Sequence, residues 1–324
     1  MPSKEELNEK FKKYCDEGKI VFVTFHPSYS YEEFIEGLTV DLGEGNKPSE
    51  NLRYTIKDGL FKTLCARALI AAMPEKPKTK KPWDWQAAYK QYCEKYSGEK
   101  SQINWNTAPK YVLIIDEINR GDISKILGEL VTLLEADKRL DADNELIVKL
   151  PLSQEDFSVP QNIYIIATMN TADRSIALLD VALRRRFGFI PMVPDLDLVL
   201  DEEENKDNIA SMEKKGNETT WKLFKESVNA LKELNKRIAK DQSLGKDKTI
   251  GHAFLFNVKT REDLIYVWKH ELLPLIDEYC YGNEDKESRL LLGSVSSQAT
   301  IDALKESIDY NLMDFLGKVI SAEN

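Results

Sequence analysis

Two stretches of the sequence combine a short apolar run with polar residues that can bind charge. They are Tyr111-Val-Leu-Ile-Ile-Asp-Glu-Ile-Asn-Arg120 and Asn162-Ile-Tyr-Ile-Ile-Ala-Thr-Met-Asn-Thr-Ala-Asp-Arg-Ser-Ile176. The first has the form of a Walker B element, in which apolar residues precede an Asp-Glu pair. In that chemistry the Asp helps to hold Mg²⁺ and the Glu polarises the attacking water. The pattern therefore predicts nucleotide hydrolysis.

The elements that must position these polar residues are the two apolar runs. Runs such as 111–115 and 163–167 are typical of central parallel strands, because helices cover both faces of such a sheet. Ligands of open α/β sheets bind outside the carboxyl ends of the strands. Asp116, Glu117, Asn170 and Asp173 all fall at those ends. The alternative for the acids is structural, either as solvated carboxylates at a strand end or as caps of the following helix.

Five segments carry a resemblance to a known family. They are Asp116-Glu-Ile-Asn-Arg120, Met169-Asn-Thr-Ala-Asp-Arg-Ser175, Leu183-Arg-Arg-Arg-Phe187, His26-Pro-Ser-Tyr-Ser-Tyr-Glu-Glu-Phe-Ile-Glu-Gly37 and Ile250-Gly-His-Ala-Phe254. In their order and spacing the first three resemble the AAA+ motor domain of the McrB family, the GTP-driven subunit of restriction systems that cut DNA at modified cytosine, and the other two are also similar to segments of that family. The resemblance covers roughly residues 20 to 280. One apolar run before Asp-Glu is a weak signal, whereas several ordered motifs make a strong one.

The resemblance implies a fold and a set of catalytic roles. The fold is α/β, an AAA+ P-loop NTPase-like parallel sheet with helices on both faces, followed by an α-helical lid. Asp116 takes the Mg²⁺ side of the nucleotide, Glu117 positions the hydrolytic water, and Asn170 orients water near the γ-phosphate. Asn suits that role because its side chain both donates and accepts hydrogen bonds. The alternative for Asn170 is a turn residue that satisfies the local backbone.

Other positions in the matching segments are candidates for nucleotide or subunit contacts. Asp173 and Arg174 are expected either to pair within their loop or to contact the neighbouring subunit. His252 lies at the lid position where family members approach the nucleotide, although a packed histidine is an equal alternative. Asn119 and Arg120 are signature residues of the family, and Arg120 has the reach for a phosphate or a partner carboxylate.

Three consecutive arginines, Arg184, Arg185 and Arg186, end a predicted helix. In AAA+ rings an arginine finger at this place reaches the γ-phosphate bound by the next subunit, where a planar cation stabilises transition-state charge. The alternative is a favourable interaction of the cations with the carboxyl end of the helix. We expect Arg185 and Arg186 to act across the interface rather than Arg184, which lies deepest in the predicted helix.

A phosphate-binding loop has the form Gly-x-x-x-x-Gly-Lys-[Ser/Thr], whose backbone N–H groups cradle phosphates at a helix N-terminus. The 324 residues contain no such segment. The resemblance places that loop upstream of the segment 26–37. We therefore expect a motor domain whose Walker A loop, first strand and first helix are missing, as in a fragment of a longer protein. A paralogue that has lost nucleotide binding is the alternative.

Composition excludes several classes of function. The net charge of −10 argues against a large nonspecific DNA-binding surface, and the family recognises DNA through another domain. The four cysteines form no Cys-x-x-Cys pair, which indicates reduced thiols in the cytoplasm and no zinc site. The three histidines are too few and too scattered for a metal cluster. We expect no signal peptide and no membrane span.

Periodicity predicts two domains, an α/β subdomain at 1–193 with an insertion at 74–108 and an α-helical lid at 194–324. Strands are predicted at 20–25, 111–115, 163–168 and 187–192, with a short hairpin at 146–150 and 157–159. Helices are predicted at 4–17, 31–37, 60–72, 83–96, 123–134, 177–186, 221–240, 261–281 and 298–316. Pro191 and Pro194 mark the boundary between the two domains.

The function expected from these features is a McrB-like nucleoside triphosphatase, an oligomeric motor of modification-dependent DNA restriction. The resemblance favours GTP over ATP, and it implies Mg²⁺, a homo-oligomeric ring expected to be a hexamer, and a separate nuclease subunit. One alternative is a MoxR-like AAA+ ATPase that remodels proteins, against which the motif 169–175 argues. Another is a non-hydrolysing ring subunit or scaffold, which the absent phosphate loop favours.

Overall fold

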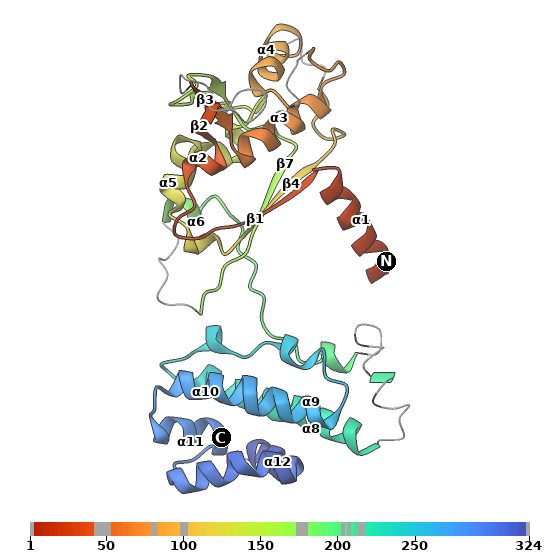
Figure 1. Cartoon of the computed structure of the whole chain (residues 1–324), viewed down its shortest axis with the longest axis vertical. Helices are drawn as coiled ribbons and strands as arrows, with labels where there is room; N and C mark the ends of the chain where they lie inside the picture. Colours follow the sequence, from red (N-terminus) through yellow and green to blue (C-terminus); the bar gives the residue numbers. More distant parts are fainter. Residues whose placement is uncertain are drawn as a thin grey trace. The chain divides into compact units, whose positions relative to one another are not determined.

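The computed structural model describes residues 3–41, 53–78, 83–97, 103–172, 181–201, 205, 209–210, 212 and 218–321. The chain divides into two compact units, Met1–Phe189 and Ile190–Asn324 (Figure 1). The division lies a few residues before the boundary predicted at 193. Asp173 and Arg174, two of the predicted site residues, lie outside the described residues.

The first unit contains a parallel sheet of three strands in the order β1-β4-β7. The strands are β1 (Ile20–Thr24), β4 (Tyr111–Asp116) and β7 (Ile163–Ala167). Ile20 pairs with Val112, and Tyr111 pairs with Ile163, so segments far apart in the sequence lie side by side (Figure 1). The three strands predicted from the apolar runs are confirmed.

The two faces of this sheet differ in burial. One face carries buried side chains such as Val23, Leu113 and Ile163, and the helix α3 (Leu60–Ala72), most of whose residues are buried, packs against β4. We call the other face the open face. On it, Val112 lies beside Tyr164, and Ile114 lies between Phe22 and Ile166. Phe22, Tyr164 and Ile166 are 58%, 49% and 56% exposed. Helices of the described residues therefore cover one face, although parallel strands are ordinarily covered on both.

Short elements surround the sheet of the first unit. The α-helices are α1 (Lys4–Asp16), α2 (Tyr31–Phe34), α4 (Trp85–Lys95), α5 (Ile123–Leu127) and α6 (Val181–Arg184). The 3-10 helices are η2 (Ile118–Arg120), η3 (Gly128–Leu134) and η4 (Ala136–Lys138). Two antiparallel hairpins pair β2 (Glu36–Asp41) with β3 (Arg53–Asp58) and β5 (Val148–Lys149) with β6 (Asp156–Phe157).

Three sequence predictions for this unit are wrong in extent or type. The helix predicted to run to Gly37 ends at Phe34, and Gly37 lies in the unpredicted hairpin β2–β3. The helix predicted over 123–134 breaks at Gly128, whose φ of +50° is a left-handed value that glycine adopts without a steric cost. The run 187–192 is not a strand, because Pro191 has no N–H to donate to a ladder and the run pairs with none of the described strands.

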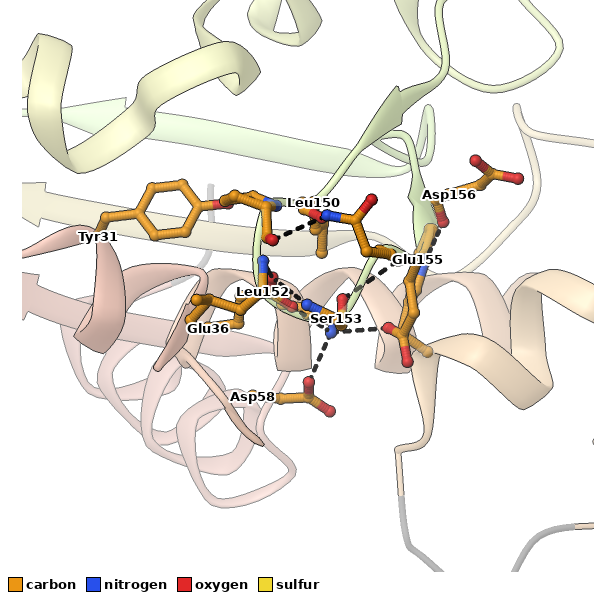
Figure 2. Close-up of polar contacts among 12 residues, drawn as sticks. Tyr31, Glu36, Asp58, Leu150, Leu152, Ser153, Glu155 and Asp156 are labelled. Atoms are coloured by element: carbon orange, nitrogen blue, oxygen red, sulfur yellow. Dashed lines mark hydrogen bonds and ion pairs between the residues drawn. The ribbon is translucent and has the colours of Figure 1, made fainter. Parts of the chain in front are cut away.

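A buried ionic cluster, which we call the Lys62 cluster, holds the base of the hairpin β2–β3. The Lys62 ammonium lies 3.0 Å from Glu36, 2.7 Å from Asp58 and 2.7 Å from Glu155 (Figure 2). Lys62 is 1% exposed and Glu36 is fully buried. Glu36 also accepts hydrogen bonds from the backbone N–H groups of Leu152 and Ser153. The cluster therefore ties α3, both ends of the hairpin β2–β3 and the turn between β5 and β6 together.

The environment shifts the pKa values within the Lys62 cluster. Burial alone raises the pKa of Glu36, but hydrogen bonds from Ser153 and Lys62 outweigh burial and hold that pKa below its ordinary 4.5. Burial alone lowers the pKa of Lys62, but the contacts with Asp58 and Glu155 outweigh it and hold that pKa above 10.5. The cluster is therefore stabilised in its charged form.

The second unit is helical. Its elements are η5 (Leu198–Leu200), α8 (Glu218–Lys240), η6 (Lys246–Lys248), η7 (His252–Leu255), α9 (Arg261–Tyr266), the π-helical turn η8 (Val267–Leu272), α10 (Leu273–Cys280), α11 (Glu284–Leu292) and α12 (Gln298–Ser321). The helices predicted at 221–240, 261–281 and 298–316 are confirmed, and α11 was not predicted. The wide turn η8 lies just before Pro274, whose ring cannot continue a regular helix.

Apolar side chains of these helices form a separate core around Phe224, Trp268 and Phe315. Trp268 and Phe315 meet edge to face, with ring centroids 5.2 Å apart. Within the part of the chain that the structure describes, no helix has the length and apolarity needed to cross a membrane.

Candidate functional site

A row of polar side chains ends the open face at the carboxyl edge of the sheet. Thr24 pairs with Asp116, and the pairing of Ile115 with Ala167 brings Thr168 opposite Asp116 on the other side. Side chains alternate between faces along a strand, so Thr24, Asp116 and Thr168 share one face. We call these three residues the acid row. It lies where ligands of parallel sheets bind.

Hydrogen bonds join the turn after β4 to the end of β7. The Thr168 hydroxyl donates to Asp116 Oδ1 at 2.6 Å and accepts from the Glu117 N–H at 3.2 Å. The Ile118 N–H donates to the Thr168 carbonyl at 3.0 Å. The Asn119 amide donates to the Asn170 carbonyl at 3.3 Å. The structure therefore places Asp116, Glu117 and the backbone of Asn170 at neighbouring strand ends. The Asn170 side-chain oxygen accepts from the Ala172 N–H at 2.9 Å, which fits the turn residue that the sequence left as the alternative.

Glu117 has a strained backbone. Its φ of 54° and ψ of 46° are left-handed, which costs a residue with a Cβ roughly 1–2 kcal/mol. Its Oε2 lies 3.3 Å from Arg120 Nε as an ion pair, and the Glu117 side chain is 26% exposed. Strained residues of this kind are concentrated at functional sites. The strain marks the Asp-Glu turn as more than the end of a strand.

The oxygen atoms around this turn fit a hard cation such as Mg²⁺. Asn119 Oδ1 is buried and receives no hydrogen bond from the described residues, whereas Glu117 Oε2 is held by its ion pair with Arg120. Asp116 is half-buried, and Thr168 engages its Oδ1. Mg²⁺ takes oxygen ligands, usually one or two carboxylates together with water and phosphate. The donor set is therefore one that this cation accepts.

The three arginines have different surroundings. Arg186 Nη2 lies 2.8 Å from Glu135 Oε1 within the same unit, and the Arg186 side chain is only 9% exposed. Arg184 is exposed and its guanidinium lies 5.7 Å from the centre of the Phe189 ring. Arg185 is exposed. Arg185 is thus the more accessible of the two arginines that the sequence favoured.

His252 belongs to the second unit, apart from the acid row. Its Nδ1 accepts a hydrogen bond from the Asp195 N–H at 3.1 Å, and its ring meets Phe256 edge to face. These contacts fit the packed histidine that the sequence left open. An open pocket of about 400 Å³ lies next to it in the same unit and is lined by Ala253, Phe254, Asn257, Val258, Asp263, Tyr266, Val267 and Glu271.

Sequence reasoning did not identify Thr24 and Thr168 as site residues. Each ends or follows a predicted strand, and a hydroxyl at such a place is a weak signal on its own. The cross-strand register places both beside Asp116, and of the two only Thr168 has a hydroxyl that hydrogen-bonds to Asp116 among the described residues.

A parallel sheet with an Asp-Glu pair at the end of its central strand, accompanied by a helical unit, is the architecture of an AAA domain. Residues 2–187 match the AAA domain (dynein-related subfamily), and residues 226–288 match the McrB, alpha-helical lid domain. The chain belongs to the AAA domain family and carries an AAA+ domain of the McrB family.

Two relatives are similar to this chain over long stretches. The EcoKMcrB subunit of the type IV methyl-directed restriction enzyme of Escherichia coli (strain K12) is 31% identical over 284 residues, covering 84% of this chain and 49% of the relative. Component YdiS of the type II restriction enzyme BsuMI of Bacillus subtilis (strain 168) is 27% identical over 190 residues, covering 53% of this chain and 52% of the relative. The chain spans about half the length of the curated relatives that it matches.

Proposed function

We propose that this chain is the motor part of a restriction-associated nucleoside triphosphatase. The observation that carries the proposal is the set of hydrogen bonds by which Thr168 holds the Asp116 carboxylate and the Glu117 backbone at the carboxyl edge of the sheet. Both relatives with long matches are components of restriction enzymes. GTP is the favoured nucleotide, by resemblance to the McrB family, and ATP is the alternative.

Each site residue has a role in this proposal. Asp116 would hold Mg²⁺, directly or through water. The bound ion would offset negative charge on the phosphate oxygens. Glu117 accepts a hydrogen bond from the attacking water and so directs its lone pair toward the phosphorus. Asn170 holds the same water by its side-chain amide. Asp173, Arg174 and His252 remain proposed contacts of the nucleotide or of the neighbouring subunit.

The nucleotide also needs a phosphate cradle, and the printed sequence has no Gly-x-x-x-x-Gly-Lys-[Ser/Thr] segment. The open face suits a strand–loop–helix unit that carries such a loop, because Phe22 and Ile166 need an apolar cover and the acid row lies at the same edge. A polypeptide of residues 1–324 should therefore bind GTP and ATP very weakly. Isothermal titration that gave a micromolar dissociation constant would overturn this part of the proposal.

Arg185 is proposed to act on the nucleotide of the next subunit in a ring. An arginine supplied in this way contributes about 10³–10⁵ in rate in related phosphoryl transfers. In the protein that includes the phosphate loop, activity per subunit should rise with protein concentration, because only assembled subunits share sites. Arg186 is the second candidate, although it must first leave Glu135.

A mixing experiment tests this arrangement. Glu117→Gln subunits keep the arginine and lose the water-positioning acid, whereas Arg185→Ala subunits do the reverse. A mixture should regain part of the activity, because some interfaces join a working acid to a working arginine. Arg186→Ala is mixed in parallel. If neither arginine variant is complemented and activity is flat with concentration, the arginine does not act across an interface.

A non-hydrolysing ring subunit is the competing function, and the absence of a phosphate-loop motif from the sequence favours it. The hydrogen bonds that hold the Asp116 carboxylate and the Glu117 backbone favour the motor, because they support the two acids at the edge where ligands of parallel sheets bind. A separate nuclease subunit and a further DNA-reading domain are the partners that the resemblance implies.

A further inference from the structure

We propose that Thr168 is the positioning residue of the site, which sets the direction of the Asp116 carboxylate and holds Glu117 in its left-handed turn. The catalytic benefit of this positioning rests on the proposed function, whereas the hydrogen bonds of Thr168 do not depend on it. Thr168 uses its N–H, its carbonyl and its hydroxyl on the strand end and turn of β4. It therefore joins the two strand ends more extensively than Asn170, which contributes one carbonyl.

The direction of the Thr168 hydroxyl follows from its two hydrogen bonds. Its oxygen accepts the Glu117 N–H at 3.2 Å, so its own proton must turn toward another acceptor. That acceptor is Asp116 Oδ1 at 2.6 Å, a short distance expected for a hydroxyl that donates to a carboxylate. With Oδ1 engaged, Asp116 presents Oδ2 to a cation. One hydroxyl thus couples the backbone of Glu117 to the orientation of Asp116.

Threonine suits position 168 better than serine or valine, the amino acids most similar to it in size and shape. Its β-branched side chain has few χ1 rotamers, so the hydroxyl is held in place before any ligand binds. Serine keeps the hydroxyl and loses that restriction. Valine keeps the shape but leaves the Glu117 N–H without an acceptor and Asp116 without a donor. Thr168→Val therefore removes the coupling, and Thr168→Ser should restore most of it.

Thr24 provides a matched control at the other end of the acid row. It pairs with Asp116 on the opposite side from Thr168 and is also exposed. No hydrogen bond of its hydroxyl to any described residue accompanies that pairing. Thr24→Val consequently makes the same chemical change beside the same carboxylate without touching the Glu117 N–H.

The first test uses the 324-residue chain and needs no nucleotide. Amide hydrogen exchange, read residue by residue by NMR, should speed up at Glu117 in Thr168→Val by about fivefold or more, the effect of losing about 1 kcal/mol of hydrogen bonding. Thr168→Ser should lie near wild type, and Thr24→Val should leave Glu117 unchanged. Equal exchange at Glu117 in wild type and Thr168→Val would overturn the proposal, and so would an equal increase in Thr24→Val.

The second test uses a protein in which this chain is joined to a phosphate loop, as the proposed function requires, and varies Mg²⁺. Thr168→Val should raise the Mg²⁺ concentration for half-maximal turnover by about 10–100-fold, the usual cost of losing a group that orients a metal ligand. Thr168→Ser should recover most of this shift. A lower melting temperature with unchanged Mg²⁺ dependence means that Thr168 has only a structural role, which overturns the inference. Absence of turnover in the wild-type protein overturns the proposed function instead, and the exchange test still decides the role of Thr168.

Discussion

The Lys62 cluster and the acid row place the same kinds of charged residue in opposite circumstances. In the cluster, Glu36 and Lys62 are buried, and each carboxylate touches the ammonium group. In the acid row and its turn, Asp116 is half-buried and pairs with no cation among the described residues. Glu117 is strained and pairs only with the exposed Arg120 among those residues. Charges that hold a fold are compensated within it, whereas charges that await a ligand are left incomplete at an open edge.

The largest effect is expected when the cation of the Lys62 cluster is removed. Lys62→Met leaves Glu36 buried beside two further carboxylates without a cation, and removing one partner of a buried pair costs about 3–5 kcal/mol. Urea unfolding of the 324-residue chain measures the free energy of unfolding. Lys125→Met is the control, because Lys125 is 84% exposed and pairs only with Asp122 among the described residues. Equal losses in both variants would show that the cluster is not a structural centre.

The next largest effect is expected at Glu117, beside the acid row, when this chain is joined to a phosphate loop. Glu117→Gln should reduce hydrolysis by at least about a hundredfold while nucleotide binding remains, because the amide cannot act as a base. Asp122→Asn is the matched control, since it neutralises a nearby exposed acid and keeps the cap on α5. Rates are compared by phosphate release at saturating nucleotide. Normal hydrolysis by Glu117→Gln would contradict the role given to Glu117.

A smaller effect concerns pH and the Lys62 cluster. Glu36 has a lowered pKa in the folded chain, so its contribution to stability is present above 4.5 and is lost as pH falls through the folded value. Glu36→Gln should therefore destabilise the chain by about 1–3 kcal/mol at pH 7, the range for hydrogen bonds to charged groups. The difference from wild type should shrink as the pH falls below 4.5. Urea unfolding at several pH values measures it, and a pH-independent difference would contradict the assignment.

The smallest expected effect is a gain in stability, whereas the changes in the Lys62 cluster are expected to lower it. Glu117→Asn places a residue that tolerates left-handed backbone at the strained position, which should stabilise the chain by about 0.5–1 kcal/mol. When this chain is joined to a phosphate loop, as the proposed function requires, the same change should abolish turnover. The melting temperature and the hydrolysis rate are measured together. A variant that loses both stability and activity would show that Glu117 carries no strain that serves the site.

The acids of the site were predictable from sequence, while their support was not. Asp116, Glu117 and Asn170 follow apolar runs, and the geometry of parallel sheets alone brings such strand ends together. Thr168 gains its role from the cross-strand register, which a single sequence does not specify. The Lys62 cluster joins Glu36, Lys62 and Glu155 from distant segments, so no local pattern reveals it.

The errors in the fold have similar causes. Glycine commonly ends helices, so Gly37 predicted a helix end rather than a strand. Leu38 and Val40 lie opposite Ile56 and Tyr54, a pattern that only the pairing of the two strands reveals. The helix α11 begins with four charged residues after Asn283, and its apolar residues form a short run at its end rather than the stripe that identified its neighbours. The run 187–192 is apolar enough for a strand but meets Pro191.

The strand order of the sheet has a consequence for how the chain is made. Ile20 pairs with Val112 and Val112 with Tyr164, so β1 leaves the ribosome long before either neighbour exists. At about 5–20 residues per second, roughly ninety residues of synthesis separate β1 from its first partner by about 5–20 s. During that interval the aromatic ring of Phe22 has nothing to pair with, and the nascent chain offers a target for chaperones. In the second unit α8 also waits for its main partner α12, but Gln298 follows Lys240 after a shorter stretch than the one that separates β1 from β4. The longest wait during synthesis, and with it the larger risk of aggregation, should therefore fall on the first unit.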